Sequence, residues 1–191
     1  MGDLSSSDGR LLHDSDPTGA TPFSATLVTV ETSVSVDEVI SRLETQTNKT
    51  GSQSLLPKVR TATTREEIEN IVKTITGDRD FLYFTQYDHG SWMNIYNSNV
   101  NGPKAIVFVI GNPLIAQGIM RHDLRSALNI PPRLLILEKD DHSGSKVVYH
   151  LPSSVMALSN GSELKAATLD LDDRLRRLVA HITAVELINY I

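Results

Sequence analysis

The chain has 191 residues, of which 40% are hydrophobic and 21% charged, an ordinary composition for one globular domain with a core. The formal net charge of −5 argues against nucleic acid as the main partner, because phosphate binding needs a basic surface. There are no cysteines, which excludes disulfides, thiolate catalysis and cysteine-based zinc sites.

The first 22 residues are rich in Ser, Asp, Gly and Pro and show no hydrophobic periodicity. We interpret residues 1–22 as a disordered or loosely attached tail. They also lack the basic start and apolar run of a secretory signal. No apolar run approaches the roughly 20 residues that cross a bilayer, so we expect no membrane association. These patterns favour a cytoplasmic protein with a single domain over residues 23–191.

The domain begins with a predicted strand and two predicted helices. Residues 24–33 alternate in polarity, which is typical of a half-buried strand. Ser35 with Glu38, and Thr64 with Glu67, have the spacing of capping boxes, and each precedes a run with helical apolar spacing. A polar link at residues 45–54 separates the two helices, and Gly77 ends the second.

An aromatic-rich strand is predicted over residues 81–89, followed by residues 91–99, which fit a strand or a short helix equally. Six of the ten aromatic residues of the chain lie between positions 81 and 96, with Asp88 and His89 among them. One interpretation is a pocket lined by aromatic rings, with His89 at its mouth as an acid or base. The alternative is that the rings fill the core and His89 caps a turn.

The next strand, residues 104–110, ends in Gly111-Asn112-Pro113. Gly permits a sharp exit from the strand, Asn is a good helix cap, and Pro suits the first helical turn. The free backbone N–H groups at such a helix start could hold a carboxylate or a carbonyl oxygen. The simpler alternative is that Asn112 is only a cap.

Further helices are predicted from Pro113 to about residue 122 and near residues 124–128. A hairpin follows around residues 142–144, and then a last helix from Asp170, its expected cap, to about Ile188. Strands 104–110 and 134–137 are apolar on both faces. Helices usually cover one face of an α+β sheet, so the second face must meet a further helix, a second subunit or a ligand pocket.

The order of these motifs resembles the domain of unknown function 302 family over roughly residues 24–188. The resemblance implies an α+β fold of TATA-binding-protein-like arrangement, with a mixed or antiparallel sheet of about four to five strands packed by helices, commonly seen as a homodimer. It implies no established reaction. Relative to the family, residues 50–77 look like a helical insertion. The matching positions are His89, Gly111, Asn112, Pro113, Asp123, Ile130, Pro131, Glu138 to Asp141 and Pro152.

We therefore predict a homodimeric protein that binds a small apolar ligand in an apolar, aromatic pocket beside the sheet. One alternative is a cofactor-independent enzyme for proton transfer, elimination or cyclisation, in which His89 is the acid or base and Asn112 holds a developing negative oxygen. Another is a structural or interaction module. We expect no metal and no cofactor. The predicted ligand-binding residues are Tyr83, Tyr87, Trp92, Tyr96, Phe108, Gly111 and Tyr149.

Overall fold

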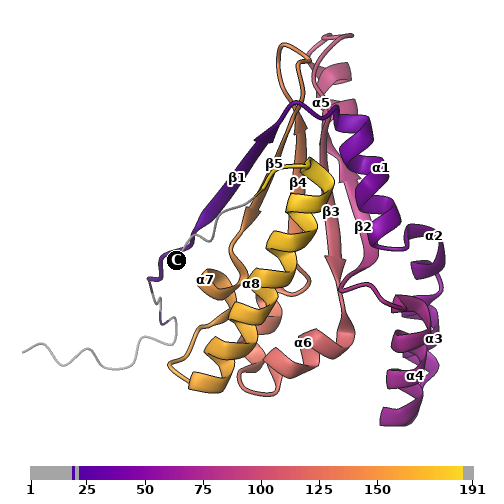
Figure 1. Cartoon of the computed structure of the whole chain (residues 1–191), viewed down its shortest axis with the longest axis vertical. Coiled ribbons are helices and arrows are strands. Elements are labelled where there is room, and N and C mark those ends of the chain that lie inside the picture. The colour runs from indigo at the N-terminus through magenta and orange to yellow at the C-terminus, as the bar shows by residue number, and fades with distance from the viewer. Residues whose placement is uncertain (1–18, 20–21, 187–191) are drawn as a thin grey trace, which may run out of the picture.

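The computed structural model of the chain describes residue 19 and residues 22–186. Most of the tail predicted at residues 1–22 lies outside the described residues. The described part contains a five-stranded sheet in the order β1-β5-β4-β3-β2, in which every neighbouring pair is antiparallel (Figure 1). This confirms the predicted α+β class. The strands are β1 (Leu27–Thr32), β2 (Leu82–Asp88), β3 (Ala105–Gly111), β4 (Arg133–Glu138) and β5 (Ser145–His150).

Helices α1 and α8 lie across one face of this sheet, and α2 to α4 stand beside its β2 edge (Figure 1). Both predicted capping boxes lie at helix starts, since Ser35 caps α1 and Thr64 caps α4, but only the box of Thr64 and Glu67 is complete, because the Glu38 side chain pairs with Arg42 instead. Of residues 91–99, which the sequence left open between a strand and a helix, residues 91–96 are helical. The helices are α1 (Val36–Gln46), α2 (Lys49–Ser52), α3 (Leu55–Thr61), α4 (Arg65–Thr76), α5 (His89–Tyr96), α6 (Pro113–Met120), a 3-10 helix (Leu124–Asn129), α7 (Pro152–Met156) and α8 (Ser162–Thr183).

The last helix begins earlier than predicted, so the prediction that Asp170 caps it is wrong. Helix α8 starts at Ser162 with Gly161 at its N-cap, which places Asp170 in its interior. Leu164 and Thr168 continue the buried stripe toward the helix start, and this packing outweighs the capping preference of an aspartate. Asp172 is buried and accepts a hydrogen bond from the backbone N–H of Ser153 at 2.8 Å, so α8 supports the start of α7.

The two faces of the sheet have different surroundings. Ile106, Phe108 and Ile110 of β3 point toward the helices and are buried in the main core. Val107 and Val109 point the other way and are only half-buried. In Figure 1, none of the described helices lies across this second side, which we call the open face. Its apolar centre consists of Val107, Val109, Leu135, Leu137 and Val148.

A smaller apolar cluster joins α3 and α4 to the edge of the sheet. Leu55, Val72, Ile75 and Leu82 are buried there. Phe84 of β2 and Leu114 of α6 pack against the same cluster. The end of β3 and the start of α6 therefore lie between the two clusters, where a pocket is formed.

Candidate functional site

The predicted Gly-Asn-Pro turn joins β3 to α6 and has the predicted cap. Asn112 is extended, and its Oδ1 accepts a hydrogen bond from the backbone N–H of Leu114 at 2.9 Å, while Pro113 occupies the first helical position. The Nδ2 atom of Asn112 donates to the backbone carbonyl of Asp80 at 3.3 Å. Both polar atoms of this side chain are therefore used to hold α6 against the start of β2.

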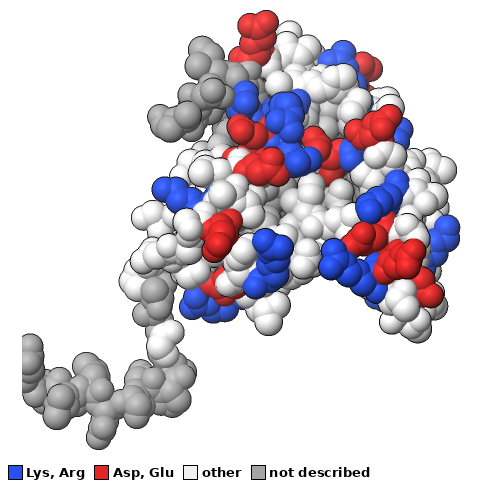
Figure 2. Space-filling model, turned by 60° about the horizontal axis from the view of Figure 1, so that its bottom comes forward, with Lys and Arg blue, Asp and Glu red and all other residues white. Residues whose placement is uncertain are grey.

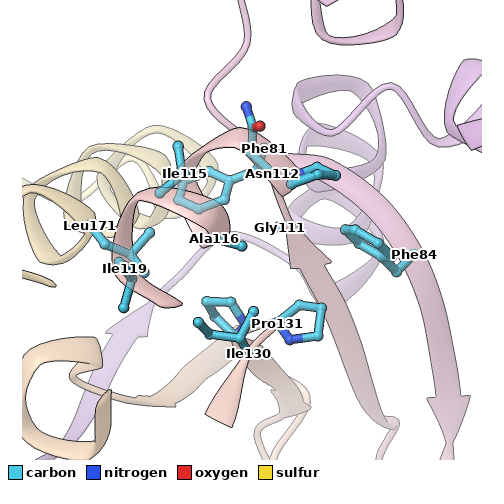
Figure 3. Close-up of a pocket in the computed structure, with 12 residues that line it drawn as sticks. Phe81, Phe84, Gly111, Asn112, Ile115, Ala116, Ile119, Ile130, Pro131 and Leu171 are labelled. Atoms are coloured by element: carbon cyan, nitrogen blue, oxygen red, sulfur yellow. The ribbon is translucent and has the colours of Figure 1, made fainter. Parts of the chain in front are cut away.

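Beneath this turn lies a pocket of about 190 Å³ between β2, β3, α6 and α8 (Figure 3). Its walls come from stretches that are distant in the sequence, and most of the lining side chains are only half-buried, so solvent reaches it. Figure 2 shows this end of the molecule with a recessed, uncharged area in its middle and charged side chains around it. The lining residues are Phe81, Phe84, Gly111, Asn112, Pro113, Ile115, Ala116, Ile119, Ile130, Pro131, Pro132 and Leu171.

Gly111 helps to keep this pocket open. A Cβ atom at position 111 would lie 3.0 Å from the Cβ atom of Pro131 and 3.3 Å from Cε2 of Phe84. These contacts are tighter than ordinary van der Waals contact, so any larger residue would push against two walls. The strand ends in glycine at a point where a side chain would occupy the space beside Pro131.

The chemistry of the pocket is that of a hydrocarbon surface. None of the described residues that line it carries a titratable side chain. Asn112 is its one polar side chain, and Figure 3 shows the amide pointing away from the surrounding rings and aliphatic groups. The pocket can therefore exclude water around an apolar group, but it offers no acid or base.

An ion cluster lies next to the pocket. The carboxylate of Asp80, the residue before Phe81, is paired with Arg174 through one oxygen and with Arg177 through the other, the second contact being 3.5 Å long. Arg174 lies one turn beyond Leu171 on α8, and its Nε also donates to Asp170 at 2.7 Å. The cluster and the pocket therefore share the start of β2 and the middle of α8.

His89 lies at the opposite end of β2 and is exposed, as the first residue of α5. Asp88 does not orient it. Asp88 caps α5, and hydrogen bonds from the side chain and backbone of Ser91 hold the pKa of this carboxyl below its usual value. The Nε1 atom of Trp92 donates to Nδ1 of His89 at 3.3 Å, and the Tyr87 ring lies 6.4 Å from the imidazole between ring centroids. His89 thus belongs to an exposed aromatic group.

The structure does not bring His89 and Asn112 together. The start of β2 pairs with Gly111, whereas Asp88 at its end pairs with the start of β3. The two residues are separated by the length of the strand, about 20 Å for six residues. One small substrate does not reach both groups, and the proposed catalytic pair has no shared pocket in the described residues.

The other predicted ligand-binding residues divide into three groups. Gly111 lines the pocket. Phe108 and Tyr149 are 0% and 4% exposed and belong to the core, and Tyr83 packs edge-on against Phe108 with ring centroids 6.4 Å apart. Tyr87, Trp92 and Tyr96 are exposed, Tyr96 by 83%. Only the Gly-Asn part of the prediction therefore coincides with the pocket.

Sequence reasoning missed most of the lining. Two features pointed to part of it: the helical spacing of Ile115, Ala116 and Ile119 after the turn, and the Pro131-Pro132 pair before a buried strand. Leu171 comes from a helix distant in the sequence, so no local pattern assigns it to this place. Phe81 and Phe84 were included in the aromatic segment but were not singled out as ligand-binding residues.

Two other acidic positions of the family pattern have structural contacts. Asp123 caps the 3-10 helix, and hydrogen bonds from Arg125 lower the pKa of its carboxyl to about 2. Glu138 accepts a hydrogen bond from the backbone N–H of Lys104 at 3.0 Å and pairs with His142 at 2.9 Å. Both carboxylates hold local turns and strand ends in place.

A second hollow, of about 530 Å³, lies on the open face at the end of the sheet that carries His89. Its lining is strongly charged, and Glu31 pairs there with Lys146 at 2.9 Å and with Lys139 at 3.7 Å.

Among the described residues, no three His, Asp or Glu side chains lie close enough together to hold a metal ion. None of the described helices is both long and apolar enough to span a bilayer.

Comparison with known proteins agrees with this fold. A crystal structure of an uncharacterized conserved protein DUF302 from Bacillus stearothermophilus superposes with a TM-score of 0.55 at 16% sequence identity, covering 83% of this chain and 96% of that one. At this identity the likeness concerns the fold alone. No curated protein shows significant similarity to the chain.

The family "Domain of unknown function DUF302" matches residues 58–182, beginning within the segment 50–77 that we expected to be an insertion. Since this match spans more than half of the sequence, the chain belongs to the DUF302 family.

Proposed function

We propose that this protein binds a small apolar ligand, or the apolar part of a larger one, in the pocket beneath Gly111. The observation that carries the proposal is a space of about 190 Å³ whose lining is almost wholly carbon. An engineered protein cavity of about 150 Å³ with a similar lining binds benzene. The absence of an acid or base among the described lining residues supports binding rather than a reaction at this place.

Binding can be tested with 1-octanol, a neutral probe whose chain suits the pocket. We expect saturable shifts of the amide and methyl NMR signals of α6 and of Phe81 and Phe84. The variant Ala116→Leu should abolish them, because Ala116 lines the pocket and a leucine there fills it while keeping a good helix former. Gln117→Leu is the matched control, since Gln117 is the next residue of α6, is exposed and does not line the pocket.

The outcome is decisive in both directions. Binding that is lost in Ala116→Leu and kept in Gln117→Leu supports the pocket as the site. Equal shifts in both variants, or shifts confined to the residues around Trp92, would contradict the proposal and direct attention to the aromatic end of β2.

We also infer that two copies of the chain associate through the open face. The supporting observation is its row of half-buried apolar residues with no described helix over it, since monomers rarely leave such a surface exposed. Both ends of the face carry charged side chains, with Asp140, Asp141 and Lys146 at one end and Arg133 at the other, so the apolar centre is the part suited to association.

Self-association can be measured by native mass spectrometry and by light scattering. The variant Leu135→Glu should give monomers, because it places a charge in the apolar centre of the open face. Leu169→Glu is the control, since Leu169 is 46% exposed on α8, on the other side of the sheet. A wild-type protein that is monomeric at all concentrations tested would refute this association.

A further inference from the structure

The size and lining of the pocket limit which part of a ligand it holds, an inference that rests on the binding function proposed for this pocket. Pockets that enclose a whole small molecule usually measure about 300 to 1,000 Å³, so a space of about 190 Å³ takes only part of one. A polar group inside would lose its hydrogen bonds to water without replacement, at a substantial cost in binding free energy. The enclosed part is therefore hydrocarbon, and the rest of the ligand stays at the rim.

Charged groups next to the rim differ in their free hydrogen-bonding capacity. Each carboxylate named here is paired: both oxygens of Asp80 contact arginines, and Asp170 accepts a hydrogen bond from Arg174. Arg174 is engaged by these two pairs, whereas Arg177 keeps free donors. The side chain of Arg177 is 56% exposed, and among described residues its guanidinium has one long contact, 3.5 Å to Asp80. A guanidinium carries five N–H donors, so most of those of Arg177 remain available.

Arg133 follows Pro132 of the lining but does not serve the pocket. It pairs with Val109 in the sheet, and the alternation along β4 puts its side chain on the open face. The unused polar capacity beside the pocket therefore consists of the guanidinium donors of Arg177, which suit a carboxylate, sulfate or phosphate.

We propose that the ligand is a monomeric amphipathic anion: an alkyl or aryl tail that fills the pocket beneath Gly111, with an acidic head group held outside by Arg177. The apolar contacts provide most of the affinity, and Arg177 provides the preference for negative charge. Because the head group remains in water, this preference is modest and depends on ionic strength.

Three probes with the same eight-carbon tail test the sign of the head group: octanoate, 1-octanol and octylammonium. Each is titrated below its micelle concentration at pH 7.5 and low salt, with binding followed by NMR. Octanoate should bind about twofold to fivefold more tightly than 1-octanol, as expected for one solvent-exposed ion pair. Octylammonium should bind most weakly. In 0.5 M NaCl the preference for octanoate should shrink toward unity.

Variants of the rim separate this inference from the binding function itself. Arg177→Gln should lower octanoate affinity to that of 1-octanol and leave 1-octanol unchanged. Arg65→Gln is the control, since Arg65 is a 92% exposed arginine of α4 whose partner is Glu69. If all three probes bind equally well to the wild type, the head-group assignment is wrong while the pocket function stands. If none binds, both proposals fail.

Discussion

The two faces of strand β3 differ in their surroundings although both are apolar. Ile106, Phe108 and Ile110 are covered by helices and are at most 8% exposed. Val107 and Val109 alternate with them but remain half-buried on the open face. Strand periodicity thus decides which residues share a side, whereas burial depends on which other elements cover that side. Substitutions on the covered and the open side can test this difference.

Phe108→Ala should produce the largest effect. Phe108 is 0% exposed, and truncation of a buried phenylalanine lowers the free energy of unfolding by about 3 to 5 kcal/mol because it leaves a cavity. Val107→Ala, its neighbour on the open face, should cost about 1 kcal/mol, since it removes two half-buried methyl-sized groups. Urea unfolding of both variants at a concentration where the wild type is monomeric measures the difference. Equal losses would mean that the open face is as well packed as the core.

Asn112→Ala should have the next largest effect, because Asn112 lies where β3 leaves the sheet and ties α6 to the covered side. The substitution removes the cap on Leu114 and the hydrogen bond to Asp80. We expect a loss of about 1 to 2 kcal/mol in the free energy of unfolding. Asn112→Asp retains an acceptor for the cap and should lose less. If both variants lose the same free energy of unfolding, the hydrogen bond from Nδ2 of Asn112 to the Asp80 carbonyl contributes the stability, and the cap on Leu114 does not.

Asp172→Asn tests the electrostatics of the covered side. Burial raises the pKa of the Asp172 carboxyl, so the folded state binds its proton more tightly than the unfolded state. The contribution of this group to stability is therefore lost as pH rises from about 4 through the folded pKa. The asparagine keeps an acceptor for Ser153 and removes the buried charge. We expect a variant at least as stable as the wild type at pH 7, with no advantage below about pH 4, in thermal unfolding at both pH values.

Asp88→Asn should lower stability at pH 7, whereas Asp172→Asn should not. The effect should be small, because Asp88 is exposed at the end of β2. Hydrogen bonds from Ser91 lower the pKa of its carboxyl, so its contribution to stability is present above about pH 4 and is lost as pH falls through the folded pKa. Thermal unfolding should show the wild type slightly more stable than the variant at pH 7, and equally stable near pH 2. A variant more stable than wild type at pH 7 would contradict the assigned cap.

Local patterns predicted many of the elements. The alternation in β1, the Ser35 cap of α1, the capping box of α4, and the Gly-Asn-Pro start of α6 are all present as predicted. Each depends on interactions within a few residues, which a sequence displays directly. Helices α2, α3 and α7 and the first two turns of α8 were missed, and α2 lies within the stretch 45–54 that was expected to be a link. The first three helices are at most seven residues long, too short to show a helical period, and packing against other elements stabilises them.

The candidate site was predicted less well than the fold. Gly111 and Asn112 were placed correctly at a helix start, but their assumed companion His89 lies at the far end of the strand. The error came from reading one aromatic-rich segment as one pocket. A strand of seven residues spans about 20 Å, so residues close together in the sequence can belong to different ends of the molecule.

The sequence by itself determined the alternation of the strands, the turn and cap at Gly111 to Pro113, and the apolar character of both faces of the sheet. These depend on backbone geometry and on interactions between near neighbours. Only the tertiary structure decided which face the helices cover, which clusters meet at Gly111, and that Phe84, Pro131 and Leu171 form one pocket there. Contacts between segments that are distant in sequence depend on how whole elements pack, and no local pattern records that packing.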